Sequence, residues 1–153
     1  MRKCILLTGA TGFLGSHLLK TLVNKGYKVV VLKRSTSDMW RLKGFEHTFK
    51  SYDIDRVPLQ KVFEDQYIDT IIHTACVYGR KGEDMHQILE TNLMFGIELL
   101  NKGISFNTQT FFNTSSLYAT LSKCLNYYTL SKVQFDEWLK MASDKIQVLN
   151  MKV

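Results

Sequence analysis

The sequence predicts an α/β fold built on a doubly wound parallel sheet. Apolar runs alternate along the chain with amphipathic stretches, and several runs are continuous in Val, Ile, Leu or Phe, as expected of strands covered on both faces. A glycine-rich turn, Thr8–Gly15, follows the first of these runs directly. Repeated alternation of strands and helices implies parallel strands joined by right-handed crossovers, and hence a doubly wound sheet.

The predicted elements follow one another without a linker, a repeat or a low-complexity segment. The expected strands are Cys4–Thr8, Lys28–Lys33, Thr48–Tyr52, Thr70–Thr74, Thr108–Asn113 and Ile146–Val153, and the expected helices are Phe13–Lys25, Leu59–Gln66, Asp84–Lys102 and Asn126–Ser143. Gly26 suits the position just after the first helix, and Pro58 suits a helix start. With 153 residues, 45% of them hydrophobic, the chain can bury one sizeable core. We therefore expect one domain over residues 1–153.

The charge pattern argues against a nucleic-acid partner. The formal net charge is +6 and the pI is about 9.2. The basic residues are scattered among separate turns, and no basic helix interleaved with aromatic residues occurs. An anionic cofactor and an anionic substrate account for the excess of basic residues equally well.

Cysteine usage and hydropathy predict a cytoplasmic protein without a membrane segment. Cys4, Cys76 and Cys124 lie far apart and form no C-x-x-C pair, so we expect reduced thiols. The opening apolar run is too short for a signal sequence, and 18 consecutive apolar residues do not occur. No metal site is expected.

The glycines of the first turn indicate a binding site for a dinucleotide. Each missing Cβ has its own use: at Gly9 it permits a tight turn, at Gly12 it lets a pyrophosphate approach the main chain, and at Gly15 it lets the helix pack closely on the strand. The backbone N–H groups of the following helix then face an anion. A chance turn is the alternative, but the motif follows a predicted strand and opens a predicted helix.

The end of the second predicted strand favours NADP over NAD. An NAD site usually offers an acid to the ribose hydroxyls here, whereas this chain has no acid until Asp38. Lys33 or Arg34 could instead pair with a 2′-phosphate, Arg34 through its planar fork. NAD remains the alternative cofactor, and the two basic residues could simply form a solvated turn.

A tyrosine and a lysine are spaced for proton transfer on one predicted helix. Tyr128 and Lys132 are four residues apart and share a helix face, so the ammonium is expected to lower the pKa of the phenol toward working pH. A surface Tyr–Lys stack is the alternative. Tyr127 is five residues from Lys132 and would point away from it.

The turn Thr8–Gly15 together with Tyr128 and Lys132 resembles the extended short-chain dehydrogenase/reductase family, the NAD-dependent epimerases and dehydratases. The resemblance covers nearly the whole chain and implies a Rossmann fold that binds NAD(P). It implies that Tyr128 and Lys132 are catalytic and also line the cofactor. Further cofactor contacts are implied within the turn, at Gly9, Thr11, Gly12, Phe13, Leu14 and Gly15.

The resemblance also assigns residues after the later strands. Asp53 and Ile54 match the pair that meets the adenine ring, and His73, Thr74 and Ala75 match the family's H-x-A turn beside the pyrophosphate and ribose; Asn92 matches a helix asparagine that supports the active site, and Ser116 the catalytic hydroxyl. Asp53 could instead cap a turn, and His73 could be a hydrogen-bonded strand-end residue. Thr114 and Ser115 remain alternatives to Ser116.

The implied reaction is reduction or epimerisation of a nucleotide-activated sugar. Dehydratases of this family carry an Asp-Glu pair after the catalytic hydroxyl, whereas Leu117-Tyr118 stands here, which disfavours dehydration. The segment Leu32–Ser37 with the H-x-A turn looks most like CDP-sugar synthases of the abequose/paratose type. Relatives continue into a substrate-binding lobe, so a cofactor-binding fragment without turnover and a regulatory scaffold are the alternatives.

The resemblance further implies a homodimer. Family members commonly associate through the helices that correspond to Asp84–Lys102 and Asn126–Ser143. Met94, Phe95, Phe135 and Trp138 could supply apolar anchors. Ordinary core packing of the same residues is the alternative.

Overall fold

The computed structural model describes residues 3–120 and 126–153, which divide into two compact units, 1–75 and 76–153. The first unit contains β1 (Cys4–Thr8), α1 (Phe13–Asn24), β2 (Lys28–Lys33), the 3₁₀ turns η1 (Trp40–Leu42) and η2 (Glu46–Thr48), β3 (Lys50–Asp53), α2 (Leu59–Asp65) and β4 (Thr70–His73). The second contains α3 (Met85–Leu89), the π-helical turn η3 (Glu90–Met94), α4 (Phe95–Ser105), β5 (Thr110–Ser115), the 3₁₀ turn η4 (Leu117–Thr120), α5 (Tyr127–Met141) and β6 (Gln147–Lys152).

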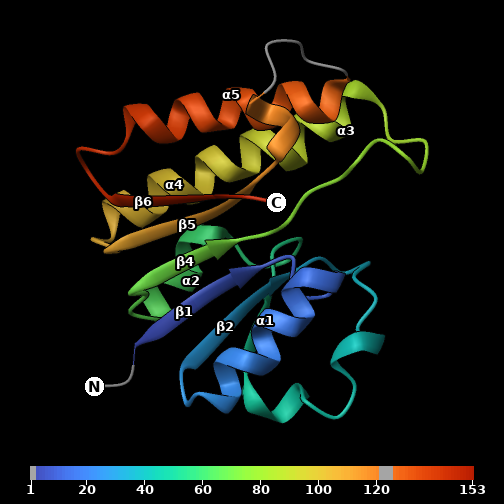
Figure 1. Ribbon diagram of the computed structural model, residues 1–153. Coiled ribbons are helices and arrows are strands. Elements are labelled where there is room, and N and C mark those ends of the chain that lie inside the picture. Colours follow the sequence, from blue (N-terminus) through green and yellow to red (C-terminus); the bar gives the residue numbers. More distant parts are fainter. Residues whose placement is uncertain (1–2, 121–125) are drawn as a thin grey trace. The chain divides into compact units, whose positions relative to one another are not determined.

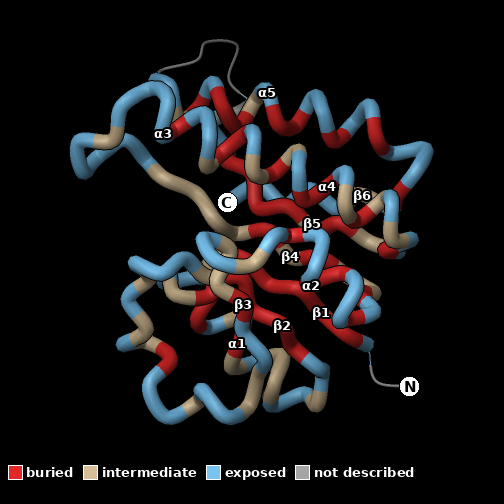
Figure 2. Tube along the Cα trace, turned by 180° about the vertical axis from the view of Figure 1, so that it is seen from behind, coloured by how far each residue is buried: buried red, intermediate tan, exposed pale blue. Residues whose placement is uncertain are grey.

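In the first unit the strands are all parallel and lie in the order β3-β2-β1-β4. The sheet therefore grows in one direction from β1 to β3 and then reverses to place β4 on the other side of β1. Figures 1 and 2, drawn from opposite sides, show α1 on one face of these strands and α2 on the other. Such a reversal creates a ligand-binding edge at the carboxyl ends of the strands.

The core of the first unit follows from the continuous apolar strands. All of β1 is buried, as are Val29 to Leu32 of β2, and Figure 2 shows these strands in red. Leu19 of α1 and Leu42 of η1 pack into the same cluster as Leu7 and Val31. Burial of each such side chain stabilises the fold by about 1.5–3 kcal/mol.

In the second unit β5 and β6 are parallel, and Figure 1 shows α4 and α5 running along them. The ring of Phe135 on α5 is buried, lies edge-on to Phe111 at 6.1 Å between centroids, and packs where a Cβ at Gly96 would come within 2.7 Å of it. Phe135 is therefore a core residue, and its alternative assignment as a dimer anchor is wrong. Met94 and Trp138 are exposed.

The predicted fold class is confirmed, and the differences from the predicted elements have local causes. The predicted third strand begins later, at Lys50, because Glu46–Thr48 forms a turn in which the Thr48 hydroxyl donates to the Phe45 carbonyl at 2.6 Å. The predicted helix 84–102 is divided by η3 and continues to Ser105. Gly26 has a φ of +81° just after α1, as expected, and Pro58 is the N-cap of α2.

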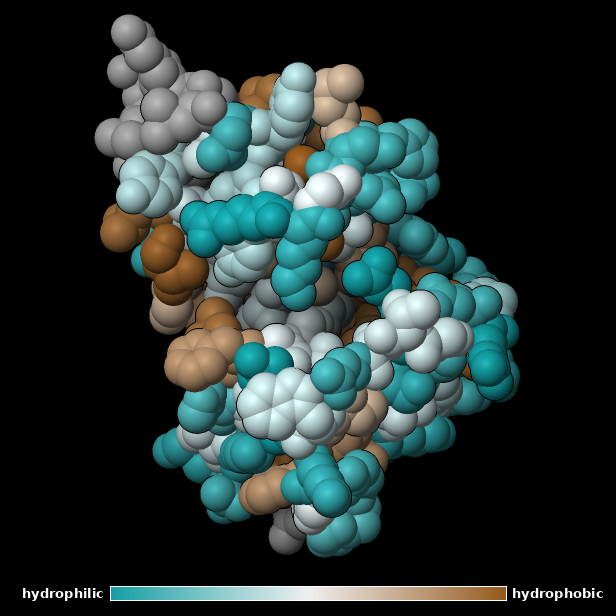
Figure 3. Space-filling model, turned by 90° about the vertical axis from the view of Figure 1, so that its right-hand side faces the viewer, coloured by the Kyte–Doolittle hydropathy of each residue, from teal (hydrophilic) through white to brown (hydrophobic). Residues whose placement is uncertain are grey.

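Within the described residues, no helix has the length and hydropathy needed to cross a membrane. Cys4 and Cys76 are free thiols, and Cys124 lies outside the described residues. On the face drawn in Figure 3 hydrophilic side chains predominate, and the hydrophobic ones form small separate groups.

Candidate functional site

The glycine turn between β1 and α1 has the geometry of an anion-binding loop. Gly9 has a φ of +69°, and a Cβ there would lie 2.6 Å from the Thr74 hydroxyl oxygen and 2.7 Å from the Ala75 nitrogen. At Gly15 a Cβ would lie 2.1 Å from the Gly9 carbonyl oxygen. α1 then starts at Phe13 with Gly12 as an N-cap that has no side chain to accept from the first N–H groups. These donors suit a pyrophosphate.

The other turn residues leave this loop accessible. Gly12, Phe13 and Leu14 are exposed, and Thr11 is half-buried. A Cβ at Gly15 would meet Gly9 and Ala10, so its absence lets α1 pack closely on the turn, whereas packing on the strand itself was predicted. The residues of this loop therefore fit a dinucleotide: Gly9 and Gly15 allow the tight turn, and the exposed Gly12 lets a ligand approach the main chain.

A hydrogen-bond network joins the end of β1 to the H-x-A turn. The Thr8 hydroxyl oxygen accepts from the backbone N–H groups of Thr74 and Ala75, both at 3.2 Å, and lies 2.8 Å from Nδ1 of His73. Since both of its lone pairs accept, the hydroxyl donates its proton to Nδ1, which places the imidazole proton on Nε2. The Thr74 hydroxyl donates to the Thr8 carbonyl at 2.8 Å. His73 and Thr74 thus fix the position of Thr8, the residue that precedes the first glycine of the turn.

At the ends of β2 and β3 the neighbouring residues Lys33 and Arg34 have different surroundings. Lys33 lies opposite Asp53, with its Nζ 3.9 Å from a carboxylate oxygen, so this ammonium faces an acid of its own chain. The Asp53 carboxylate also accepts from the Ser35 hydroxyl at 2.6 Å, which is the main cause of the lowered pKa of Asp53. Arg34 is exposed, and its guanidinium has no ion pair within the described residues. Ile54 follows Asp53 and is half-buried.

In the second unit, the side-chain amide of Asn92, at the centre of the π-helical turn, has hydrogen-bond partners for its nitrogen and its oxygen. Its amide nitrogen donates to the Val77 carbonyl at 2.8 Å and to the Ser131 hydroxyl at 3.1 Å, and its oxygen accepts from the Val77 N–H at 2.8 Å. A buried amide costs stability unless such partners exist. Asn92 therefore fastens the segment that follows the H-x-A turn to α5.

The structure brings Ser116, Tyr128 and Lys132 together in the second unit. A hydrogen bond with Ser116 acts on the Tyr128 hydroxyl. Lys132 is 3% exposed, its Nζ donates to the Thr114 carbonyl at 3.0 Å, and it lies 5.9 Å from the centroid of the Tyr128 ring. The Ser115 hydroxyl donates instead to Asp136. Of the three candidate residues, the arrangement thus favours Ser116 as the hydroxyl that accompanies Tyr128.

The prediction that Lys132 lowers the pKa of Tyr128 is wrong. The pKa of Tyr128 is raised, first by burial and then by the charge of Cys76, and the hydrogen bond from Ser116 and the charge of Arg80 only partly oppose this. Burial also lowers the pKa of Lys132. The spacing predicts that the two residues share a face, but it does not predict how far both are removed from water.

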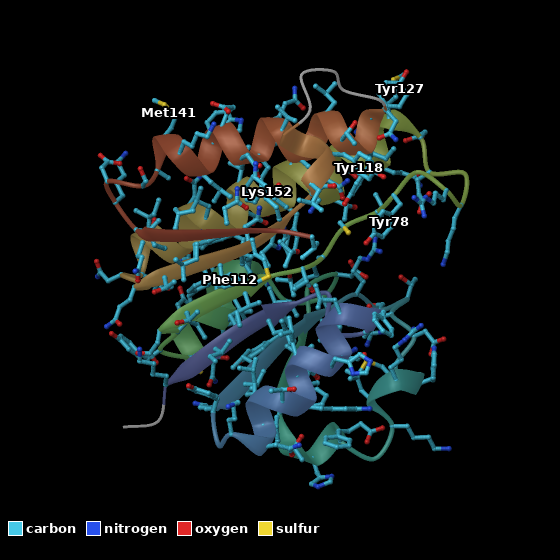
Figure 4. The ribbon with its side chains drawn as sticks, viewed as in Figure 1. Tyr78, Phe112, Tyr118, Tyr127, Met141 and Lys152 are labelled. Carbon is cyan, nitrogen blue, oxygen red and sulfur yellow. The ribbon has the colours of Figure 1, made fainter. Side chains whose placement is uncertain are left out.

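Three residues near Tyr128 were not predicted from the sequence. The ring of Tyr78 lies 4.9 Å from that of Tyr128, and the Arg80 guanidinium lies 5.5 Å from the Tyr78 centroid. The neighbouring Cys76, through its charge and a hydrogen bond, raises the pKa of Tyr78 to about 12. Figure 4 shows Tyr78 well apart from Tyr127, which lies at the start of α5. The pattern Tyr78-Gly79-Arg80 just after the H-x-A turn was the only available signal.

The chain matches the model of one protein family and is similar in sequence to several characterised proteins. The model of the NAD dependent epimerase/dehydratase family matches residues 5–152. The chain is 29% identical over 144 residues to the CDP-abequose synthase of Salmonella muenchen, an alignment that covers 92% of this chain and 48% of that protein. It is 30% identical over 130 residues to a UDP-glucose 4-epimerase of Caenorhabditis elegans, covering 73% and 37%. The chain thus spans about half the length of the curated relatives it matches.

A solved structure shows the same fold. The UDP-glucuronic acid 4-epimerase of Bacillus cereus, determined in complex with UDP-glucuronic acid and NAD, superposes with a TM-score of 0.83 at 24% identity. The match covers 97% of this chain and 55% of that one. At this identity the likeness establishes the fold alone, which agrees with the doubly wound parallel sheet predicted from the sequence.

Proposed function

Because the chain belongs to the NAD-dependent epimerase/dehydratase family, we propose that it is an NADP(H)-dependent oxidoreductase or epimerase acting on a nucleotide-activated sugar. The observation that carries the proposal is the cluster of Tyr128, Ser116 and Lys132, in which the hydroxyl of Ser116 is bonded to that of Tyr128. Both units belong to one cofactor-binding domain in this proposal, with the glycine turn holding the pyrophosphate. The fit of that turn to a dinucleotide supports the cofactor class.

Each residue of the catalytic cluster has a distinct part in the proposed reaction. When bound, the nicotinamide supplies a hydride to the carbonyl carbon or takes one from a carbinol. Tyr128 exchanges the proton at the sugar oxygen, and the Ser116 hydroxyl holds that oxygen by a hydrogen bond. Lys132 holds the nicotinamide ribose. Charge on the sugar oxygen is thereby balanced as the proton moves.

The electrostatics of Tyr128 support reduction as the favoured direction. Because the pKa of Tyr128 is raised by burial, the phenol keeps its proton at neutral pH and is ready to act as an acid toward a keto group. Epimerisation needs both directions of proton transfer at the same residue. Dehydration remains disfavoured, since Leu117-Tyr118 stands where dehydratases carry two acids.

Isotope transfer tests this function directly. The purified chain is incubated with NADPH deuterated at C4 and a CDP- or dTDP-4-keto-6-deoxyhexose, and the sugar is analysed by mass spectrometry. Deuterium bound to carbon in the sugar supports reduction, and formation of a C4 epimer from a UDP-hexose supports epimerisation. A folded chain that binds cofactor but transforms neither substrate supports a cofactor-binding fragment or a regulatory scaffold instead.

We predict that Arg34→Ala weakens NADPH binding about tenfold or more, the value of a charge-assisted hydrogen bond to phosphate, and leaves NADH binding unchanged. Arg34 is the exposed guanidinium after β2 without an ion pair in the described chain, whereas Lys33 already faces Asp53. Calorimetry with both cofactors measures the effect. Lys43→Ala, which removes an equal charge from another exposed position of the first unit, is the control. An equal loss of affinity for NADPH and NADH in Arg34→Ala would show that Arg34 does not bind the 2′-phosphate.

We also propose a homodimer through the helices 84–102 and 126–143. Met94 and Trp138 on this unit are about half exposed, at 54% and 53%, and Met141 at the end of α5 is 80% exposed and labelled in Figure 4. Apolar and aromatic side chains of this kind form interface anchors. Light scattering is expected to give twice the monomer mass for the wild type and the monomer mass for Trp138→Glu. Tyr67→Glu, at an exposed aromatic of the first unit, should remain dimeric.

A further inference from the structure

α5 carries a buried carboxylate that the proposed reaction does not use. Asp136 is 6% exposed, and its Oδ2 accepts from the Ser115 hydroxyl at 2.8 Å. Its Oδ1 is buried and has no hydrogen-bond partner among the described residues. A carboxylate removed from water is costly unless an opposite charge compensates it. A cation close to Asp136 provides such compensation.

The charge of Asp136 acts on two lysines of α5, the exposed Lys140, which pairs with Glu137, and the buried Lys132. Lys132 precedes Asp136 by four residues on α5, so both side chains share one face of the helix. Lys132 is itself almost completely buried, and its ammonium donates to the carbonyl of Thr114 rather than to a carboxylate. Burial lowers the pKa of Lys132, and the charges of Cys76 and Asp136 oppose that effect. In the described part of the chain, Asp136 is the only carboxylate that does so.

Three successive residues at the end of β5 have different partners around Lys132 and Asp136. The Thr114 carbonyl accepts from Lys132, the Ser115 hydroxyl donates to Asp136, and the Ser116 hydroxyl is bonded to Tyr128. One strand end therefore fixes the proton-transfer residue, the ammonium and the buried carboxylate together. The Ser115 hydroxyl donates its proton to Asp136, so that hydrogen bond is its contribution to this arrangement.

We propose that Asp136 is a positioning residue that keeps Lys132 charged, and that the Ser115 hydroxyl holds the Asp136 carboxylate in place for this purpose. The inference rests on the proposed function in one respect, namely that Lys132 must be an ammonium to hold the nicotinamide ribose. Lys132 is the catalytic residue of the pair. Asp136 touches neither substrate nor cofactor and acts only through Lys132.

The groups that face Lys132 determine how the test must be arranged. They are the Tyr128 ring and Asp136 on α5, the Thr114 carbonyl on β5, and the Cys76 thiol, which acts on Lys132 when ionised. Arg80 acts on Tyr128. Measurements are therefore made in a Cys76→Ala background, so that the charge of Cys76 does not act on Lys132 beside that of Asp136.

We predict that Asp136→Asn lowers the pKa of Lys132, because the buried ammonium then loses its opposing charge. Asparagine keeps the shape of the side chain and an oxygen that can accept from Ser115. The chain is labelled with 13C at lysine Cε, Lys132 is assigned with Lys132→Arg, and the titration is followed by NMR without cofactor or sugar. Glu137→Gln removes the same charge from the neighbouring exposed position, where it pairs with Lys140, and should leave Lys132 unchanged. Equal titration curves in the two variants would overturn the proposal.

A second variant covers the case in which Asp136→Asn does not fold. Ser115→Ala keeps the Asp136 carboxylate and removes the hydroxyl that holds it in place. Ser115→Ala is therefore expected to lower the pKa of Lys132, whereas Ser143→Ala, at an exposed serine just after α5, is not. An unchanged Lys132 titration in Ser115→Ala would contradict the proposal. Since neither titration requires turnover, both results stand whether or not the proposed reaction is found.

Discussion

Replacing Gly15 with alanine is expected to destabilise the chain by about 3 kcal/mol and to abolish cofactor binding, because the added Cβ would lie 2.1 Å from the Gly9 carbonyl oxygen. The atoms it meets belong to the backbone of the turn, so no flexible side chain can move aside. Either α1 separates from β1 or the turn opens, and in both cases the N–H groups lose their common direction. Urea unfolding and calorimetry with NADPH measure the two effects.

The control for this variant is Gly26→Ala. Gly26 has a φ of +81° but has open space around its Cβ position, so alanine there bears only the cost of a left-handed backbone, about 1 kcal/mol. NADPH binding should survive in Gly26→Ala. If both variants lose the same stability and both keep the cofactor, the close packing of α1 on the turn is not what shapes the site.

Replacing Tyr128 with phenylalanine is expected to reduce turnover of the nucleotide sugar by about 10²–10⁴-fold, the usual contribution of a positioned acid or base. Phenylalanine retains the ring that stacks on Tyr78 and removes only the hydroxyl that bonds to Ser116. NADPH binding and the unfolding free energy should therefore change little. Steady-state kinetics with the substrate found by isotope transfer gives kcat for both enzymes.

Tyr127→Phe is the matched control, since Tyr127 is 56% exposed and lies next to Tyr128 at the start of α5. Its turnover should equal that of the wild type. The pH dependence gives a second check: because the pKa of Tyr128 is raised, its proton is retained through neutral pH and reduction should decline only in alkaline solution. Wild-type activity in Tyr128→Phe would show that another group moves the proton.

Much of the architecture could be predicted because it depends on neighbours in the sequence. The continuous apolar residues of Cys4–Thr8 and Lys28–Lys33 match strands covered on both faces, and both strands have the predicted bounds. Glycines at spacing three are typical of the tight strand-to-helix turn that binds a dinucleotide pyrophosphate. The spacing of four between Tyr128 and Lys132 places both on one face of α5 whatever packs against it.

The alternatives that the sequence left open were decided by contacts across the fold. Lys33 and Arg34 are equivalent as basic residues, but the register of β2 on β3 sets Lys33 opposite Asp53 and leaves Arg34 in solvent. Thr114, Ser115 and Ser116 all carry a hydroxyl at a strand end. Only the packing of α5 on this strand directs Ser115 to Asp136 and Ser116 to Tyr128.

The sequence by itself therefore determined the fold class, the glycine turn and the residues available for chemistry, since short-range spacing fixes which side chains share a face or a turn. Tertiary structure alone decided the protonation of those residues and their partners. The pKa of Tyr128 rises and that of Lys132 falls because both are buried, and burial depends on segments tens of residues away. For the same reason Asp136, a polar residue on an ordinary helix in the sequence, becomes a buried carboxyl group only in the folded chain.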